Sequence, residues 1–210
     1  MERPNMPGAY GMVTSANSPS PYRGGLFGPD FEHSVFISEP VHNLVHREML
    51  APDGITFTSH RAKGEEKSEF LASTDNWFRP TMTKTGPDGA LYVADMYRLV
   101  IEHPKWIPPG MQSRVNLREG SNRGRIWRVL PKGSKLRKTP RLNRMSTKTL
   151  VTALDSPNGW QRDTIQRLLL ARGGEDASAD LRKLAQTSKS PKVRLQSLCI
   201  LEGLDSLNSK

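Results

Sequence analysis

Cysteine is almost absent from this sequence of 210 residues, which contains only Cys199. A single cysteine forms no intrachain disulfide, and it cannot supply the pair required by a CxxCH haem-attachment motif. Cys199 stands in a leucine-rich stretch with helical spacing. We therefore expect a buried structural thiol there, not a nucleophile or a metal ligand.

Long apolar runs are also missing. No run approaches the ~20 residues that a helix needs to cross a bilayer. The segment Met1 to Tyr10 lacks the charged-then-apolar pattern of a secretory signal. We expect no transmembrane segment and no signal peptide in this chain. A single thiol suits both a reducing compartment and the periplasm, so localisation stays open.

Charge of one sign is in excess, since the formal net charge is +10. The basic residues concentrate between Arg114 and Arg144. In the second part of that stretch they lie among proline, glycine and serine, without the interleaved aromatic residues of a nucleic-acid stacking surface. We interpret residues 132–145 as a solvated basic linker and expect no nucleic-acid binding.

Proline and glycine are dense up to about Gly133, after which leucine, lysine and glutamine take over. A shift of this kind indicates two architectures in one chain. The sequence predicts a multidomain protein, β then α. Its β region covers residues 1–131, the linker residues 132–145 and the helical region residues 146–210.

The β region contains a repeated unit. Gly28-Pro29-Asp30 precedes the short apolar run at 34–39, and Gly86-Pro87-Asp88-Gly89 precedes the one at 90–95. A tight turn feeding a buried strand has this pattern, and its repetition indicates a propeller or a meander.

Adding the neighbouring runs predicts a partial β-propeller of about two blades. The first blade has four strands, at Met12–Ala16, Ser34–Ser38, Asn43–Leu50 and Ile55–His60. The second has three, at Pro80–Thr85, Ala90–Asp95 and Arg125–Leu130, with residues 96–124 as an inserted loop. We expect its fourth strand to be missing from this chain.

The apolar period becomes helical after Arg144. Four short helices are predicted, with caps at Ser146 or Thr147 and at Asn158, a stop at Gly173-Gly174, a third helix at Ala179–Gln186 and a fourth start at Ser190-Pro191. An offset of about 33 positions relates the second helix to the fourth, for example Ile165 to Leu198, close to known helical-repeat periods. We interpret the region as two HEAT-like α-helical hairpins at the start of an array.

Four strings in the sequence point to one family: EPVHNLVHRE at 39–48, DNWFRP at 75–80, GPDGALYVADMY at 86–97 and GRIWRV at 124–129. Together they resemble the planctomycete membrane-bound dehydrogenase-like proteins of the c-type cytochrome family. The resemblance spans nearly the whole chain, because members of that family continue from a propeller into HEAT repeats.

The resemblance implies a propeller akin to the sugar dehydrogenases that use pyrroloquinoline quinone, then HEAT repeats, then a c-type cytochrome domain with haem c that accepts electrons. By the same resemblance the location is periplasmic. This chain is then a fragment of a quinoprotein-like sugar or alcohol dehydrogenase, with the missing blades and the cytochrome domain as partners. We expect no cofactor and no catalysis in the chain alone.

The alternative is a non-enzymatic propeller and HEAT scaffold that binds a protein or a polyanion along its helical surface.

One departure from the relatives bears on the compartment and on the rigidity of the first blade. The resemblance implies cysteines near Asn17 and Ser38 in many relatives, on strands that could lie side by side, and here neither residue is cysteine. If those cysteines form a disulfide in the relatives, this chain has lost it.

Propeller loops that enter each innermost strand, or join its second and third strands, open on one face. A quinone there needs cationic anchors, and its substrate needs a base. The second blade gathers Arg79, Asp95, Tyr97, Arg98 and His103, and the first gathers Glu39, His42 and Asn43.

We predict His42 or His103 as the base and the other six residues as cofactor contacts. An Arg79 to Asp95 ion pair that ties two strands together is the competing interpretation. His42 and His46 lie four apart on a strand, about 13 Å from each other, so no metal site is predicted. Trp77, Phe78 and Trp127 are predicted to lie in the core between the blades.

Overall fold

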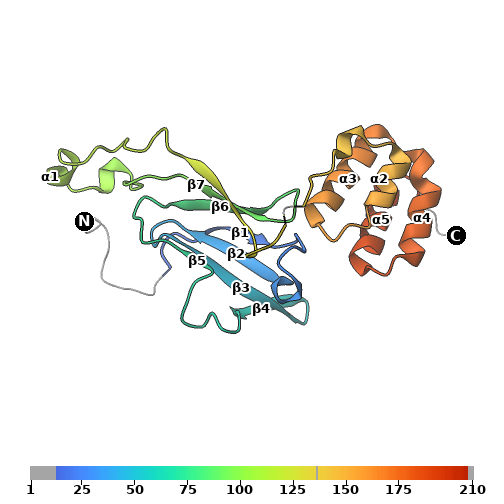
Figure 1. Ribbon diagram of the computed structural model, residues 1–210, viewed down its shortest axis with the longest axis horizontal. Coiled ribbons are helices and arrows are strands. Elements are labelled where there is room, and N and C mark those ends of the chain that lie inside the picture. Colours follow the sequence, from blue (N-terminus) through green and yellow to red (C-terminus); the bar gives the residue numbers. More distant parts are fainter. Residues whose placement is uncertain (1–12, 136, 208–210) are drawn as a thin grey trace. The chain divides into compact units, whose positions relative to one another are not determined.

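The computed structural model describes residues 13–135 and 137–207. Its first half consists of antiparallel strands and its second half of helices, as predicted (Figure 1). The chain divides into two compact units. The sheet unit comprises the segment up to Tyr22, Phe31–Lys84 and Leu91–Val129, and the helical unit comprises Arg23–Asp30, Thr85–Ala90 and Leu130–Lys210.

The first sheet is an antiparallel meander in the order β1-β2-β3-β4, with β5 paired to β3. Its strands are β1 (Asn17–Pro21), β2 (Ser34–Glu39), β3 (Leu44–Asp53), β4 (Thr56–Arg61) and β5 (Leu71–Ala72). Alternation buries Phe36 and Val45 completely. The predicted strands at 34–38, 43–50 and 55–60 are confirmed within three residues, whereas β5 was not predicted.

The predicted strand Met12–Ala16 is wrong over its described part, because residues 13–16 form a bend and β1 begins at Asn17; Met12 lies outside the described residues. The strand occupies the sequence NSPSP, whose two prolines have low β propensity. An edge strand tolerates proline because one side of its backbone needs no ladder partner. Asn17 pairs directly with Ser38 across the β1–β2 ladder.

The second sheet has the order β6-β7-β8. Its strands are β6 (Pro80–Thr85), β7 (Leu91–Asp95) and β8 (Arg125–Val129), within one residue of the prediction. The insertion after β7 contains a short 3-10 helix, Pro104–Trp106, and α1 (Pro109–Gln112). No fourth strand joins this sheet within the part of the chain that the structure describes.

Helices fill the rest of the chain: α2 (Thr147–Ala153), α3 (Gly159–Arg172), α4 (Ser178–Thr187) and α5 (Pro191–Gly203), with short 3-10 turns at Leu142–Arg144 and Glu175–Ala177. The predicted signals are confirmed. Ser146 caps α2, Asn158 caps α3 and Gly173 ends α3 at φ 61°. Among the described residues, no helix combines the length and apolar character needed to cross a bilayer.

Two predictions for the helical region, a solvated linker up to residue 145 and a buried Cys199, differ from the structure. Leu142, in the predicted linker, is buried in the same cluster as Leu150 and Leu169. The Arg172 guanidinium donates to the carbonyls of Asn143 and Met145, which holds that segment against the helices. The predicted linker is therefore folded at its end. Cys199 is exposed, not buried, because it lies on the outer side of α5.

Equivalent hydrogen bonds recur in the two helix pairs. Arg162 Nη1 donates to the Ser156 carbonyl at 2.6 Å, and Arg194 Nη1 donates to the Ser188 carbonyl at 3.1 Å, 32 positions later. The predicted offset of 33 equates Ile165 with Leu198, which is 42% exposed. An offset of 32 pairs Ile165 with Ser197, which are both fully buried, so these positions and the recurring hydrogen bonds are 32 residues apart and not 33.

Candidate functional site

The centre of the predicted site is Arg79, at the entry of β6. Its side chain is fully buried. The guanidinium donates to three main-chain carbonyls: Nη1 to Pro40 at 2.9 Å, Nε to Arg98 at 2.9 Å and Nη2 to Leu99 at 2.7 Å. Pro40 lies in the turn after β2, so this one side chain links the first sheet to the second and to the insertion.

Asp95, the last residue of β7, is the acceptor beside it. Its Oδ1 accepts the main-chain N–H groups of Arg79 at 2.8 Å and Tyr97 at 2.9 Å, and its Oδ2 accepts Trp127 Nε1–H at 2.9 Å. Arg79 and Asp95 are thus joined through the arginine main chain. A buried carboxylate with three donors is well satisfied, and it organises the chain around it.

The first sheet contributes two predicted residues. Asn43 has φ 58°, and its Nδ2 donates to the carbonyls of Phe78 and Asn76, just before β6. Glu39 is buried at the end of β2, where its carboxylate accepts the N–H groups of Ser15 and Val41. Both side chains hold turns through main-chain contacts. We call Glu39, Asn43, Arg79 and Asp95 the Arg79 cluster.

Tyr97, two residues after Asp95, has a left-handed backbone conformation with φ 49°. Aromatic residues adopt that conformation rarely, and it persists only when neighbours impose it. Here the Asp95 carboxylate holds the tyrosine N–H, and Asp75 Oδ2 accepts the phenol at 2.9 Å. The hydrogen bond to Asp75, with partial burial and the aspartate charge, raises the pKa of Tyr97 despite Arg125 and Arg123 nearby.

Around Tyr97 lies a set of rings and cations that we call the aromatic–arginine stack: Trp77, Tyr97, Arg123, Arg125 and Trp127. The Trp77 and Tyr97 ring centroids are 5.5 Å apart. The Arg125 guanidinium lies 3.6 Å from the Tyr97 centroid and 5.6 Å from that of Trp127, and Arg123 lies 5.9 Å from that of Trp77. Such distances are those of cation–π contacts.

Four of these five residues were missed as functional candidates: Arg123 and Arg125 were not singled out, and Trp77, which is half-buried, and Trp127 were predicted to lie in the core. Trp127 is instead 45% exposed, on β8, which is one of the two edge strands of its sheet. Phe78 is buried, as predicted. Arg123 and Arg125 stand within NRGRIWRV at 122–129, and arginines close to a tryptophan were the available signal.

Of the two histidines predicted as the base, His103 lies in the insertion after β7 and His42 in the turn after β2. His103 is exposed and caps the 3-10 helix Pro104–Trp106, where Nδ1 accepts the Lys105 N–H at 3.2 Å. His42 is half-buried in the turn between β2 and β3. Arg98 donates to the Arg118 carbonyl at 3.1 Å. The structure brings Arg79, Asp95, Tyr97 and the Arg98 main chain together, and it gives His103 a capping role.

A third histidine, His46 on β3, lies between two carboxylates. Its Nε2 is 2.6 Å from Glu48 and its Nδ1 is 2.7 Å from Glu69, which also binds Arg61 at 2.8 Å. Burial alone raises the pKa of Glu69, but hydrogen bonds and charges from Arg61 and His46 outweigh it and lower that pKa. Over the described residues, no group of three His, Cys, Asp or Glu side chains is arranged to hold a metal ion.

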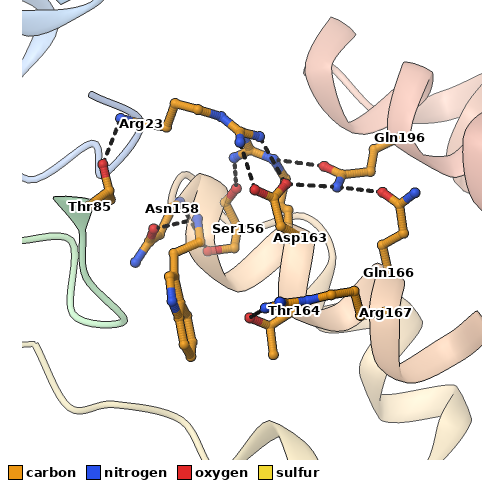
Figure 2. Close-up of polar contacts among 11 residues, drawn as sticks. Arg23, Thr85, Ser156, Asn158, Asp163, Thr164, Gln166, Arg167 and Gln196 are labelled. Carbon is orange, nitrogen blue, oxygen red and sulfur yellow. Dashed lines mark hydrogen bonds and ion pairs between the residues drawn. The ribbon is translucent and has the colours of Figure 1, made fainter. Parts of the chain in front are cut away.

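The helical unit has a polar cluster of its own, at the start of α3 (Figure 2). Arg23 donates to both Asp163 oxygens, at 2.6 and 3.0 Å, and its main-chain N–H binds Thr85 Oγ1. Gln196 on α5 donates to Asp163 at 3.2 Å. Burial alone raises the pKa of Asp163, but the bonds from Arg23 and Gln196 and the nearby positive charges lower it.

Asn158 completes this cluster, which we call the Arg23–Asp163 cluster. Its Oδ1 caps Trp160 N–H, while its Nδ2 donates to the carbonyls of Gly86 and Pro87, both at 3.0 Å. Asn158 thus holds the segment Thr85–Ala90 to α3, and the Arg23–Asp163 ion pair holds Arg23–Asp30 to the same helix. Both segments therefore belong to the helical unit. The predicted boundary at residue 131 assigns both segments to the β region.

One known family matches this chain. The family described as "Domain of unknown function (DUF7133)" matches residues 1–133. The chain belongs to this family. The DUF7133 region includes both sheets, the Arg79 cluster and the aromatic–arginine stack, while α2 to α5 lie beyond it. Searches of curated proteins and of solved structures each gave no match.

The Arg79 cluster of this DUF7133 chain can be tested against the quinone that the family resemblance implies. Such a cofactor needs guanidinium groups that face its carboxylates. The Arg79 guanidinium donates to three carbonyls, and both Asp95 oxygens accept protein donors. These two residues do not fit as direct cofactor ligands, and the geometry gives them a bracing role.

Proposed function

We propose that the chain forms two adjoining blades of a quinoprotein-like dehydrogenase propeller and the first two hairpins of a HEAT-like array. Its own role is structural: it joins the propeller to the repeats that follow. Sugar or alcohol oxidation, and electron transfer to a c-type cytochrome domain, are then activities of the larger protein and not of this chain alone.

The observation that carries the proposal is the bracing role of Arg79. Its guanidinium connects the turn after β2 with the loop after β7 through carbonyl oxygens. A buried guanidinium that donates to main-chain carbonyls orders the backbone. A ligand would have to break those hydrogen bonds before it could accept from the same donors. Adjacent blades of a ring need this type of connection, since each packs its sheet against the next.

The repeated hydrogen bonds of the two helix pairs support the HEAT-like part. Each pair starts its second helix with a serine-led turn and an arginine that returns to the turn carbonyl. Repeats of one design stack and bury a continuous core. Polyanion binding along this surface is less well supported, because Arg162 is buried and Arg172 and Arg182 donate to main-chain carbonyls.

An oxidation assay tests the proposal. The purified chain, supplied with pyrroloquinoline quinone, calcium and an electron-accepting dye, should oxidise sugars and alcohols only at the background rate. Turnover that is abolished by Arg79→Ala but kept by Arg144→Ala would overturn it. Arg144 is the matched control because it is an exposed arginine of the helical unit.

A further inference from the structure

The aromatic–arginine stack has an open side at Trp127, whose residue is 45% exposed. Arg125 donates its Nε–H to the Arg123 carbonyl at 3.2 Å, which fixes the guanidinium over the Tyr97 ring. Within residues 13–135 and 137–207, neither the Nη groups of Arg125 nor the guanidinium of Arg123 has a hydrogen-bond partner. Two cations therefore keep donors available, Arg125 beside the Trp127 indole and Arg123 beside the Trp77 indole.

Hydrogen bonds to two aspartates, Asp75 and Asp95, hold the three aromatic residues in place. The Trp127 indole N–H binds Asp95, and Asp75 binds both the Tyr97 phenol and the Trp77 main-chain N–H. Gly120 leaves room for the stack, because a Cβ there would lie 3.1 Å from the Trp77 ring. Rings that are already held by hydrogen bonds lose little freedom when a ligand binds, so the site is preorganised.

We propose that the aromatic–arginine stack is a binding site for an acidic saccharide. The apolar C–H face of a pyranose ring lies flat on the Trp127 indole, and a carboxylate or sulfate on that sugar accepts hydrogen bonds from Arg125 and Arg123. Guanidinium groups bind such anions in a bidentate geometry, and a guanidinium stacked on a ring is already oriented for it.

A single-stranded nucleic acid suits the same chemistry less well. Strand-binding surfaces offer successive aromatic faces, one for each base. Here Arg125 covers the Tyr97 ring, and Trp77 packs beside it, so Trp127 is the most exposed of the three aromatic residues. One exposed ring in a stack that carries two cations matches one charged sugar unit. The inference goes beyond the proposed function, because it concerns binding without oxidation.

Titration of the full chain with trigalacturonic acid tests the site, by calorimetry and by tryptophan fluorescence. We expect saturable binding that weakens with salt, and no binding of the neutral trisaccharide maltotriose. Arg125→Gln and Arg123→Gln should each weaken binding by roughly tenfold, the effect of losing one charged hydrogen-bonded contact. Arg144→Gln removes the same charge elsewhere and should leave affinity unchanged.

Several outcomes would overturn the proposal. These are no saturable binding of trigalacturonic acid, equal weakening by Arg144→Gln, or tighter binding of an oligothymidylate than of the acidic trisaccharide. Circular dichroism of each variant shows that the fold is kept, and the two arginine variants act as independent tests of one site.

Discussion

Asn17 and Ser38 face each other across the β1–β2 ladder, and both carry a buried side-chain oxygen without a hydrogen-bond partner in the described part of the chain, Asn17 Oδ1 and Ser38 Oγ. Unsatisfied buried polar atoms are rare in folded proteins and costly. The family resemblance implies cysteines near these two positions in many relatives. The register is what such a pairing requires, since directly paired residues have Cα atoms within disulfide range.

We expect the double substitution Asn17→Cys with Ser38→Cys to form a disulfide under oxidising conditions. The crosslink should raise the free energy of unfolding by about 3 kcal/mol, the effect expected for a loop of this size. It also removes two unsatisfied polar atoms. Urea unfolding with and without reductant measures the gain. Each single cysteine variant is the control, and a crosslinked protein no more stable than its reduced form would contradict the expectation.

Arg79→Ala should be among the most damaging substitutions in the chain. It leaves three carbonyls without their donor and removes a fully buried side chain, so we expect a loss of at least about 3 kcal/mol. Arg144→Ala, at an exposed arginine, should change stability by less than about 0.5 kcal/mol. Equal midpoints of the two variants in urea would show that the Arg79 cluster does not brace the sheets.

Gly89→Ala tests the close approach of the two segments in the helical unit. Gly89 has φ 88°, and an added Cβ would lie 2.7 Å from the Gly24 carbonyl oxygen. Gly54 also has a positive φ, 57°, but open space around it. We expect about 1 kcal/mol of destabilisation for Gly54→Ala from backbone strain alone, and about 3 kcal/mol for Gly89→Ala. Equal costs measured by thermal unfolding would mean that the two segments separate in solution.

Stability should fall in acid for a defined reason. The pKa values of Asp163 and Glu69 are lower in the folded protein than their ordinary values of 3.8 and 4.5. A lowered folded-state pKa gives stability that is present above the unfolded value and is lost as the pH falls through the folded value.

We therefore expect unfolding midpoints in urea to decline below about pH 4.5, and less so at high salt, which screens these charges. Glu69→Gln should flatten the decline, because the residue then no longer titrates. An acid limb unchanged by Glu69→Gln would assign the loss to other carboxylates.

The two-part fold was predictable because the periodicity of apolar residues changes once, and because caps such as Asn158 and Gly173 mark helix ends. β1 was not, since tertiary pairing overrides the poor strand propensity of its two prolines. Leu142 shows the same limit, because a leucine among basic residues has no local sign of joining a distant core.

The candidate site was predicted in part. Arg79, Asp95 and Tyr97 were grouped correctly, since they flank the ends of neighbouring strands. Their roles were not evident, because the Arg79 acceptors are main-chain carbonyls, which a sequence does not display. The exposure of Trp127 depends on β8 being an edge strand, which in turn depends on strand order.

Hydrogen exchange of the isolated chain tests most directly whether it contributes open blades to a larger ring. In the structure β4 and β8 are edge strands of the two sheets, and nearly all of their residues are exposed. About half of the amides of an antiparallel edge strand point away from the ladder and should exchange at once, while β2, β3 and β7 stay protected. Protection of both outer edges in a monomeric, cooperatively unfolding protein would contradict the proposal and show that the chain is structurally complete without neighbouring blades.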